Sequence, residues 1–197
     1  YATTIDLEEQ RNIDGRFDTS DFETLGFEVV NRSEFESVTV VYGLEYLLDE
    51  QDGTRNGAVR TQFPNAEAET MSVFAEATFA ITDRFDLIAG ARFDSYDRDV
   101  DDPLLPDASD DFFSPRIGFS YRPTDNWQVY GNVARAFRAP TLTELYNDGV
   151  HFATAPFAPF PLPPGVTFTG VNNFVPTHGL RPEKATNVAI GVRFENT

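Results

Sequence analysis

The sequence MSVFAEATFAITDRFDLIAGARFD, residues 71–94, contains two alternating stretches on either side of a short turn. In each stretch every second residue is apolar, and most of the residues between are polar or small. A period of two places alternate side chains on opposite faces, so the pattern predicts two antiparallel β-strands, each with one apolar face. The apolar positions are Met71, Val73, Ala75, Ala77, Phe79 and Ile81 in the first strand and Phe85, Leu87, Ala89, Ala91 and Phe93 in the second.

The same period recurs along most of the chain. Strands of about 10–13 residues are longer than the 5–6 residues typical of soluble sheets, and they suit a tilted crossing of a bilayer. The sequence therefore favours membrane-spanning strands. Further strands are expected over residues 38–48, 113–121, 127–133 and 188–194, with weaker candidates over residues 1–7 and 22–31.

The connections between these strands alternate in length. Short turns on one side of a sheet and long loops on the other are typical of outer-membrane barrels. We therefore predict an all-β fold, an antiparallel up-and-down transmembrane β-barrel segment of about eight strands. The short turns are expected at residues 31–35, 82–84 and 123–126, and the long loops at residues 49–69, 96–111 and 139–184.

Composition excludes several classes of protein. The 197 residues carry a net charge of -17, from 32 acidic and 15 basic residues, which argues against a nucleic-acid partner. Cysteine is absent, so disulfides, zinc thiolate sites and cysteine nucleophiles are excluded. No apolar run reaches the ~20 residues of a membrane helix, but alternating barrel strands do not need one. The aromatic content of 14% suits both membrane girdles and a soluble β-sandwich core.

Two details of the strand pattern bear on the barrel. The polar-phase residues are often Gly, Ala, Ser or Thr, too small to fill the lumen of a closed eight-stranded barrel, which favours part of a larger one. Arg135 falls on the apolar phase between Val133 and Phe137. Either it reaches the outer headgroup level, or a bulge turns it inward, and the sequence leaves both open.

Two motifs frame the longest connection. FRAPTLTELYNDGVHF covers residues 137–152, and GLRPEKATN covers residues 179–187. Together they resemble the "FRAP" and "NPNLRPE" boxes of TonB-dependent outer-membrane haem and haemoglobin receptors. The residues that carry the resemblance are Phe137, Arg138, Ala139, Pro140, Glu144 and Tyr146 in the first box and Leu180, Arg181, Pro182 and Glu183 in the second.

The resemblance implies a ligand and an architecture. The family has a haem-ligating histidine between the boxes, and His151 takes that place, so it is expected to bind haem iron as an axial ligand. From the residue alone, His151 is read as a solvated loop histidine. The resemblance also implies a barrel of about 22 strands around a plug. Residues 1–197 are then expected to form part of the barrel, with the plug and closing strands outside this sequence.

His178 is a second-ranked haem ligand. It lies at the start of the second box, where Thr177, His178 and Gly179 replace the first three residues of the family motif. A loop residue near a strand start is the simpler interpretation. The second haem histidine typical of the family lies in the plug and is not in this chain.

The charged residues and prolines of the boxes are expected to be structural. Arg138 and Glu144 from the first box and Arg181 and Glu183 from the second are expected to cross-link the two ends of the loop. Pro140 and Pro182 are expected to end strand pairing, since proline has no N–H to donate. Direct ligand contact is the alternative role.

Two further loops are open to more than one interpretation. Residues 153–164 combine five prolines with Phe157 and Phe160; they form either an apolar surface for a host haem protein or an ordinary stiffened loop. Phe152, Phe157 and Phe160 are also candidates for packing against the porphyrin. Residues 97–111 are rich in Asp but lack the Gly and Glu spacing of an EF-hand, so a solvated acidic loop is favoured over a cation site.

The sequence thus predicts TonB-dependent uptake of haem, free or extracted from haemoglobin, across the bacterial outer membrane. Haem is the transported ligand, no enzymatic cofactor is expected, and the TonB system would act through the plug. A siderophore, transferrin or lactoferrin receptor is the alternative within the superfamily, and it would not need His151. A porin or a barrel enzyme is the alternative outside it. No Gly-x-Ser-x-Gly elbow or His-x-x-x-His pair supports catalysis, and the protein is not expected to be an enzyme.

Overall fold

The chain forms one large antiparallel sheet with a small helical and ribbon insertion. The computed structural model describes residues 2–11, 15–60, 64–153 and 171–195. Within these ranges no helix is long and apolar enough to cross a bilayer. The elements are β1 (Ala2–Arg11), β2 (Arg16–Glu34), β3 (Val38–Arg55), β4 (Ala58–Val59), β5 (Ala66–Thr82), β6 (Phe85–Val100), β7 (Ala108–Thr124), β8 (Trp127–Arg138), α1 (Leu142–Tyr146), β9 (Gly149–Ala153), β10 (Val171–Phe174) and β11 (Glu183–Phe194).

The strands pair in chain order, which confirms the up-and-down topology. The sheet runs β1-β2-β3-β5-β6-β7-β8-β11, with the short β4 paired to β3, and all pairs are antiparallel. β1 and β11 form the two edges, so the sheet is open, as a segment of a barrel would be. Every expected strand lies within an observed one, although Tyr1 is outside the described residues.

The strands are longer than the alternation indicates, and the loops are shorter. The connection from β3 to β5 covers residues 56–65 and that from β6 to β7 covers residues 101–107, instead of 49–69 and 96–111. The strand ends are rich in polar residues on both faces. They therefore lack the apolar period by which a strand is recognised in the sequence, although they pair as strands. Four residues assigned to an acidic loop, Asp97, Asp99, Asp110 and Asp111, therefore lie in β6 and β7.

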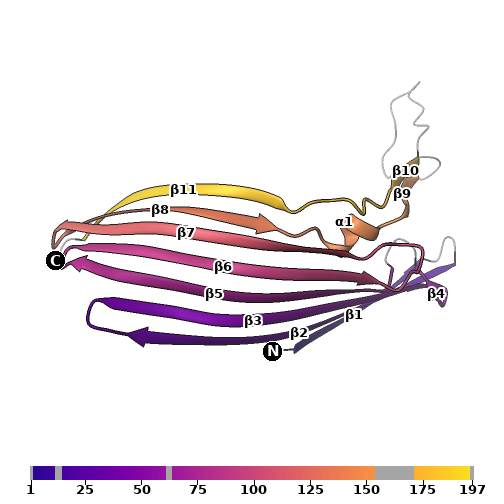
Figure 1. Cartoon of the computed structure of the whole chain (residues 1–197). Helices are drawn as coiled ribbons and strands as arrows, with labels where there is room; N and C mark the ends of the chain where they lie inside the picture. The colour runs from indigo at the N-terminus through magenta and orange to yellow at the C-terminus, as the bar shows by residue number, and fades with distance from the viewer. Residues whose placement is uncertain (1, 12–14, 61–63, 154–170, 196–197) are drawn as a thin grey trace, which may run out of the picture.

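The two ends of the sheet differ as expected. Figure 1 shows the β2–β3, β5–β6 and β7–β8 turns at one end and the longer connections at the opposite end. Trp127 begins β8 directly after a short turn, so it lies at the short-turn end. One boundary is corrected: the turn expected at residues 31–35 lies at residues 35–37, because β2 continues to Glu34.

The outer face of the sheet is apolar and exposed. The pairing places Val29, Leu44, Val73, Phe93 and Phe113 in one row across five strands, and all are at least 43% exposed. A soluble protein would bury such a face, since apolar side chains gain free energy on leaving water. The single outer face expected from the sequence is therefore confirmed.

The inner face carries polar side chains that pair with one another. Arg92 Nη2 donates to Glu45 and Arg92 Nε donates to Asp94, each at 2.6 Å, and Ser72 Oγ donates to the same Asp94 carboxylate at 2.7 Å. Arg116 pairs with Glu76 at 3.0 Å farther along this face. These residues belong to the four adjacent strands β3, β5, β6 and β7. Ion pairs therefore connect the strands on the inner face, whereas the outer face carries apolar side chains.

Arg135, whose direction the sequence leaves open, lies where β8 is no longer paired with β7 among the described residues, and its guanidinium approaches a ring on the inner face. Regular pairing of β7 with β8 runs only to Arg116 and Ala134 among the described pairs, and Pro115, which has no N–H, comes next. Beyond it, Arg135 lies 5.3 Å from the ring of Phe112, which is 5% exposed on the inner face. β8 pairs with β11 without a register shift, so β8 itself contains no bulge.

Candidate functional site

Arg138 joins the two ends of the longest loop. It is the last residue of β8, and its guanidinium donates two hydrogen bonds of 2.9 Å to Glu144 in α1. Arg138 Nε also donates to Glu183, the first residue of β11, at 3.1 Å. Both boxes therefore meet at one guanidinium, and the fork of Arg138 matches a carboxylate in the bidentate geometry that makes such pairs strong.

Glu144 also caps the helix that follows the first box. Its backbone N–H donates to the Thr141 hydroxyl at 3.2 Å, and its carboxylate accepts from the Thr141 backbone N–H at 2.9 Å. This reciprocal pair is a capping box, which satisfies helix donors that have no partner within the helix. Hydrogen bonds from Arg138 and Thr141 lower the pKa of Glu144 to about 2.

α1 is anchored to the inner face of the sheet by its apolar side. Leu145 and Tyr146 are fully buried, and they pack against Ala66 and Ala68 at the loop end of β5. The small alanines leave room for the large side chains of the helix. The Tyr146 hydroxyl donates to the carbonyl of Arg98 in β6 at 3.0 Å. Burial raises the pKa of Tyr146, so the hydroxyl stays protonated as a donor.

The second box packs against this helix. The Thr177 N–H donates to the carbonyl of Leu145 at 3.1 Å, and the ring of His178 lies 5.8 Å from that of Tyr146. Nδ1 of His178 is buried without a hydrogen-bond partner among the described residues. This placement gives His178 a packing contact beside α1. Pro182 is buried, whereas Arg181 and Leu180 are exposed.

His151 lies on a two-stranded ribbon beyond α1. β9 and β10 pair antiparallel, with Phe152 opposite Asn172 and Val150 opposite Asn173. The register shifts between these two pairs, so His151 is the extra residue of a β-bulge. Its backbone is described and its side chain is not. Phe157, Phe160 and the prolines of the loop lie outside the described residues.

An aromatic cluster under the loop was not expected from the sequence. Phe137 of the first box lies 4.4 Å from Phe112 and 6.2 Å from Tyr96, measured between ring centroids. Tyr96 and Phe112 come from β6 and β7, so no local motif joins these three residues. Pro115, within the apolar period of β7, marks the point beyond which no β7–β8 pair is seen among the described residues. Of the other box residues, Pro140 is buried and Ala139 is half-buried.

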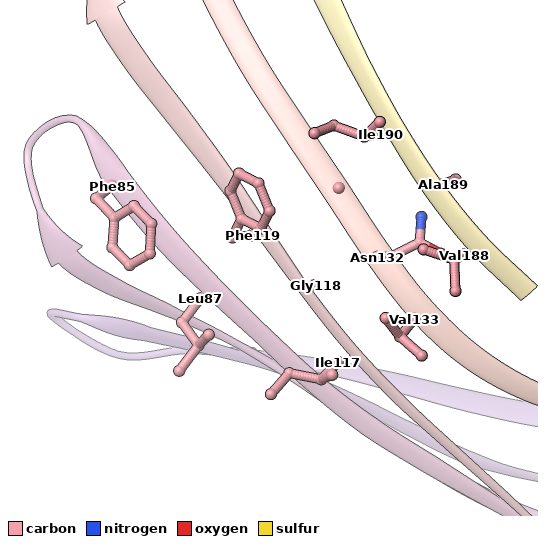
Figure 2. A pocket seen from close by; sticks show the side chains of 11 residues that line it. Phe85, Leu87, Ile117, Gly118, Phe119, Asn132, Val133, Val188, Ala189 and Ile190 are labelled. Atoms are coloured by element: carbon pink, nitrogen blue, oxygen red, sulfur yellow. The ribbon is translucent and has the colours of Figure 1, made fainter.

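An apolar hollow of about 610 Å³ lies on the opposite, outer face. Figure 2 shows Phe85, Phe119, Ile117, Val133 and Val188 along its walls. Gly131 also lines it; this glycine pairs with Phe119 on one side and Ile190 on the other and adds no side chain between them. With neither an ionisable residue nor a loop in its lining, the hollow belongs to the apolar surface and not to the candidate site.

Comparison with known proteins agrees with this architecture. The family model described as "TonB dependent receptor-like, beta-barrel" matches residues 2–197. The hemin receptor of Yersinia pestis is 36% identical over 160 residues, covering 80% of this chain and 22% of the receptor. Heme/hemopexin utilization protein C of Haemophilus influenzae (strain 86-028NP) is 28% identical over 190 residues, covering 92% of this chain and 25% of that protein. The chain thus spans about a quarter of the length of these relatives.

A solved structure supports the fold in three dimensions. The copper transporter OprC superposes with a TM-score of 0.68 at 19% identity, covering 92% of this chain and 28% of the transporter. At this identity the likeness concerns the fold alone. With the family match and the exposed apolar face, it confirms the resemblance read from the two boxes. The chain belongs to the TonB-dependent receptor β-barrel family, and its apolar outer face is the surface that the outer membrane covers.

Proposed function

We propose that this chain is the part of a TonB-dependent receptor barrel that carries the haem-binding loop, and that His151 is an axial ligand of the haem iron. Residues 1–197 would form about eight strands of a larger barrel that encloses a plug. The TonB system would act on that plug to drive uptake of haem, free or extracted from a haem protein. Haem is the transported cargo in this proposal.

The observation that carries the proposal is the position of His151 at the bulge of the β9–β10 ribbon. A bulge re-aims a side chain out of the regular alternation, and bulges are frequent beside binding sites. A neutral imidazole is a good axial ligand for haem iron. The hemin receptor of Y. pestis, at 36% identity, supports haem as the cargo.

The anchoring of the loop supports the same role. Arg138 holds α1 and the start of β11, and Tyr146 holds α1 on β6. The ribbon follows α1 after only two residues, 147 and 148. A side chain that binds iron loses less conformational entropy on binding when the backbone that carries it is already held in place. The anchoring of α1 therefore favours an iron-binding histidine on the adjacent ribbon.

The test is substitution of His151 in the full-length receptor. His151→Ala should impair haem binding and growth on haem, because it removes an iron bond, while barrel assembly stays unchanged. His178→Ala is the matched control: it removes the other histidine of the chain, which packs beside Tyr146, and should affect haem binding less. Soret spectra, growth on haem and on haemoglobin, and folded-barrel mobility in gels are the measurements.

The outcome also separates haem from the alternative cargoes. Unchanged haem spectra and growth in the His151→Ala variant would contradict the assignment of the ligand. Growth on a siderophore or on transferrin iron by the unmodified receptor, without growth on haem, would identify the other branch of the superfamily.

A further inference from the structure

The described cations of this chain are mostly neutralised. Nine arginines lie within 4.0 Å of a carboxylate, and a tenth, Arg98, donates to two backbone carbonyls. Nothing is described of the side chains of Arg11 and Arg16; among the cations whose side chains the structure describes, the exceptions are Arg135, Arg181 and Lys184. In a chain with a net charge of -17, a cation without a carboxylate neighbour is unusual, and these three lie on or beside the β8–β11 pair.

Two of the three exceptions converge on one aromatic ring. The Arg135 guanidinium and the Lys184 Nζ each lie 5.3 Å from the centroid of Phe112. They come from different strands, since Lys184 pairs with Phe137 and Arg135 pairs with Thr186. Like charges repel, so two cations over the same ring create a positive site whose energy falls when an anion binds.

The ring beneath the two cations lies on the inner face of the sheet. Phe112 is 5% exposed and its ring lies on the face that carries Tyr96 and α1, whereas the adjacent Phe113 is 56% exposed on the membrane-covered face. A lipid phosphate would approach from the outer face. The anion that fits this site is therefore one that travels through the receptor.

We propose that Arg135 and Lys184 bind the propionate carboxylates of haem beside the buried ring of Phe112. The inference rests on the proposed function, and it adds the groups that recognise the charged edge of the porphyrin. Guanidinium and ammonium donors form charge-assisted hydrogen bonds with carboxylates, and both Arg135 and Lys184 are exposed and so accessible to an anion. The loop histidine binds the metal, and these two residues bind the side groups.

The experiment compares two probes on the purified full-length receptor in detergent. Haemin has free carboxylates, and haemin dimethyl ester has none. In the Arg135→Gln/Lys184→Gln double variant, affinity for haemin should fall about tenfold or more, because the charged hydrogen bonds to the propionates are lost. Affinity for the ester should match that of the unmodified receptor. Soret titration measures both.

Two further variants control for fold and charge. Arg181→Gln removes the third unpaired cation away from the Phe112 ring and should leave both affinities unchanged. Arg135→Lys/Lys184→Arg keeps both charges and should retain most of the affinity for haemin. Equal binding of haemin by the double variant and the unmodified receptor would overturn the inference, and so would an equal loss for both probes. If the unmodified receptor binds neither probe, the proposed function itself fails.

Discussion

Two connections between neighbouring antiparallel strands show how differently this chain holds its parts together. β5 and β6 are joined by residues 83–84 alone, whereas β8 and β11 are joined by residues 139–182. The short turn needs only the register of the strands that it connects. The long loop has its own supports: an arginine between its two ends, a capping box and two buried side chains of α1. We therefore expect that substitutions can unfold the loop without unfolding the sheet, and that the two parts have separate stabilities.

The largest effect is expected in the sheet, at Gly43. A Cβ here would overlap the backbone carbonyl of Val29 and lie 2.7 Å from Phe74 Cζ. Gly43→Leu should destabilise the barrel by about 3 kcal/mol or more, because the backbone has no room to shift within paired strands. Urea unfolding in lipid vesicles measures this.

Gly179→Leu is the matched loop variant, because nothing lies within 4 Å of a Cβ at Gly179. Its unfolding curve should match that of the unmodified protein. If the two leucine variants unfold alike, the separation of sheet and loop is contradicted.

An intermediate effect is expected at Leu145, which is fully buried in α1. Leu145→Ala should cost about 2–5 kcal/mol in the docking of α1, from lost burial and the cavity that remains. Hydrogen exchange should accelerate in α1 and in residues 174–182 and stay unchanged in β5 and β6. Leu180→Ala removes the same side chain from a position that is 42% exposed, and it should change hydrogen exchange neither in the loop nor in β5 and β6. Faster exchange throughout the sheet would show that loop and barrel unfold together.

The smallest effect is expected from acid, through Glu144. Its pKa falls from 4.5 to about 2 in the folded chain, so the unfolded loop binds a proton more readily than the folded one. The charged carboxylate therefore stabilises α1 fully above pH 4.5, and this contribution is lost as the pH falls toward 2. Pulsed hydrogen exchange in α1, corrected for intrinsic rates, should show the loss across that window.

Glu144→Gln supplies the control for the acid experiment. It removes the titrating group and keeps a side chain that accepts hydrogen bonds, so protection of α1 should be lower and nearly independent of pH. A Glu144→Gln profile that follows the unmodified protein would assign the acid sensitivity to another group.

Local patterns in the sequence were sufficient for the sheet. The alternation through Met71, Val73 and Phe93 predicts both the strands and the face that meets the membrane. The ends of the strands were missed because residues such as Asp97 and Asp110 keep strand geometry where both faces are largely polar.

The loop was predicted less completely. α1 was not expected, although Thr141 and Glu144 have capping-box spacing and Leu145 and Tyr146 supply apolar anchors. That signal is local and was available. No local signal predicts the cluster of Tyr96, Phe112 and Phe137, because it joins three strands and depends on where β7 and β8 separate.

The loop leaves and re-enters the sheet at a single pair of opposed residues, Arg138 and Glu183. Because these residues already face each other across the sheet, the length of the chain between them has little influence on the strands, and the entropy of closing a loop grows only slowly with its length. Residues 139–182 therefore form an exchangeable cassette. A different segment, grafted between the same two anchor residues, would leave the wall that crosses the membrane unaltered.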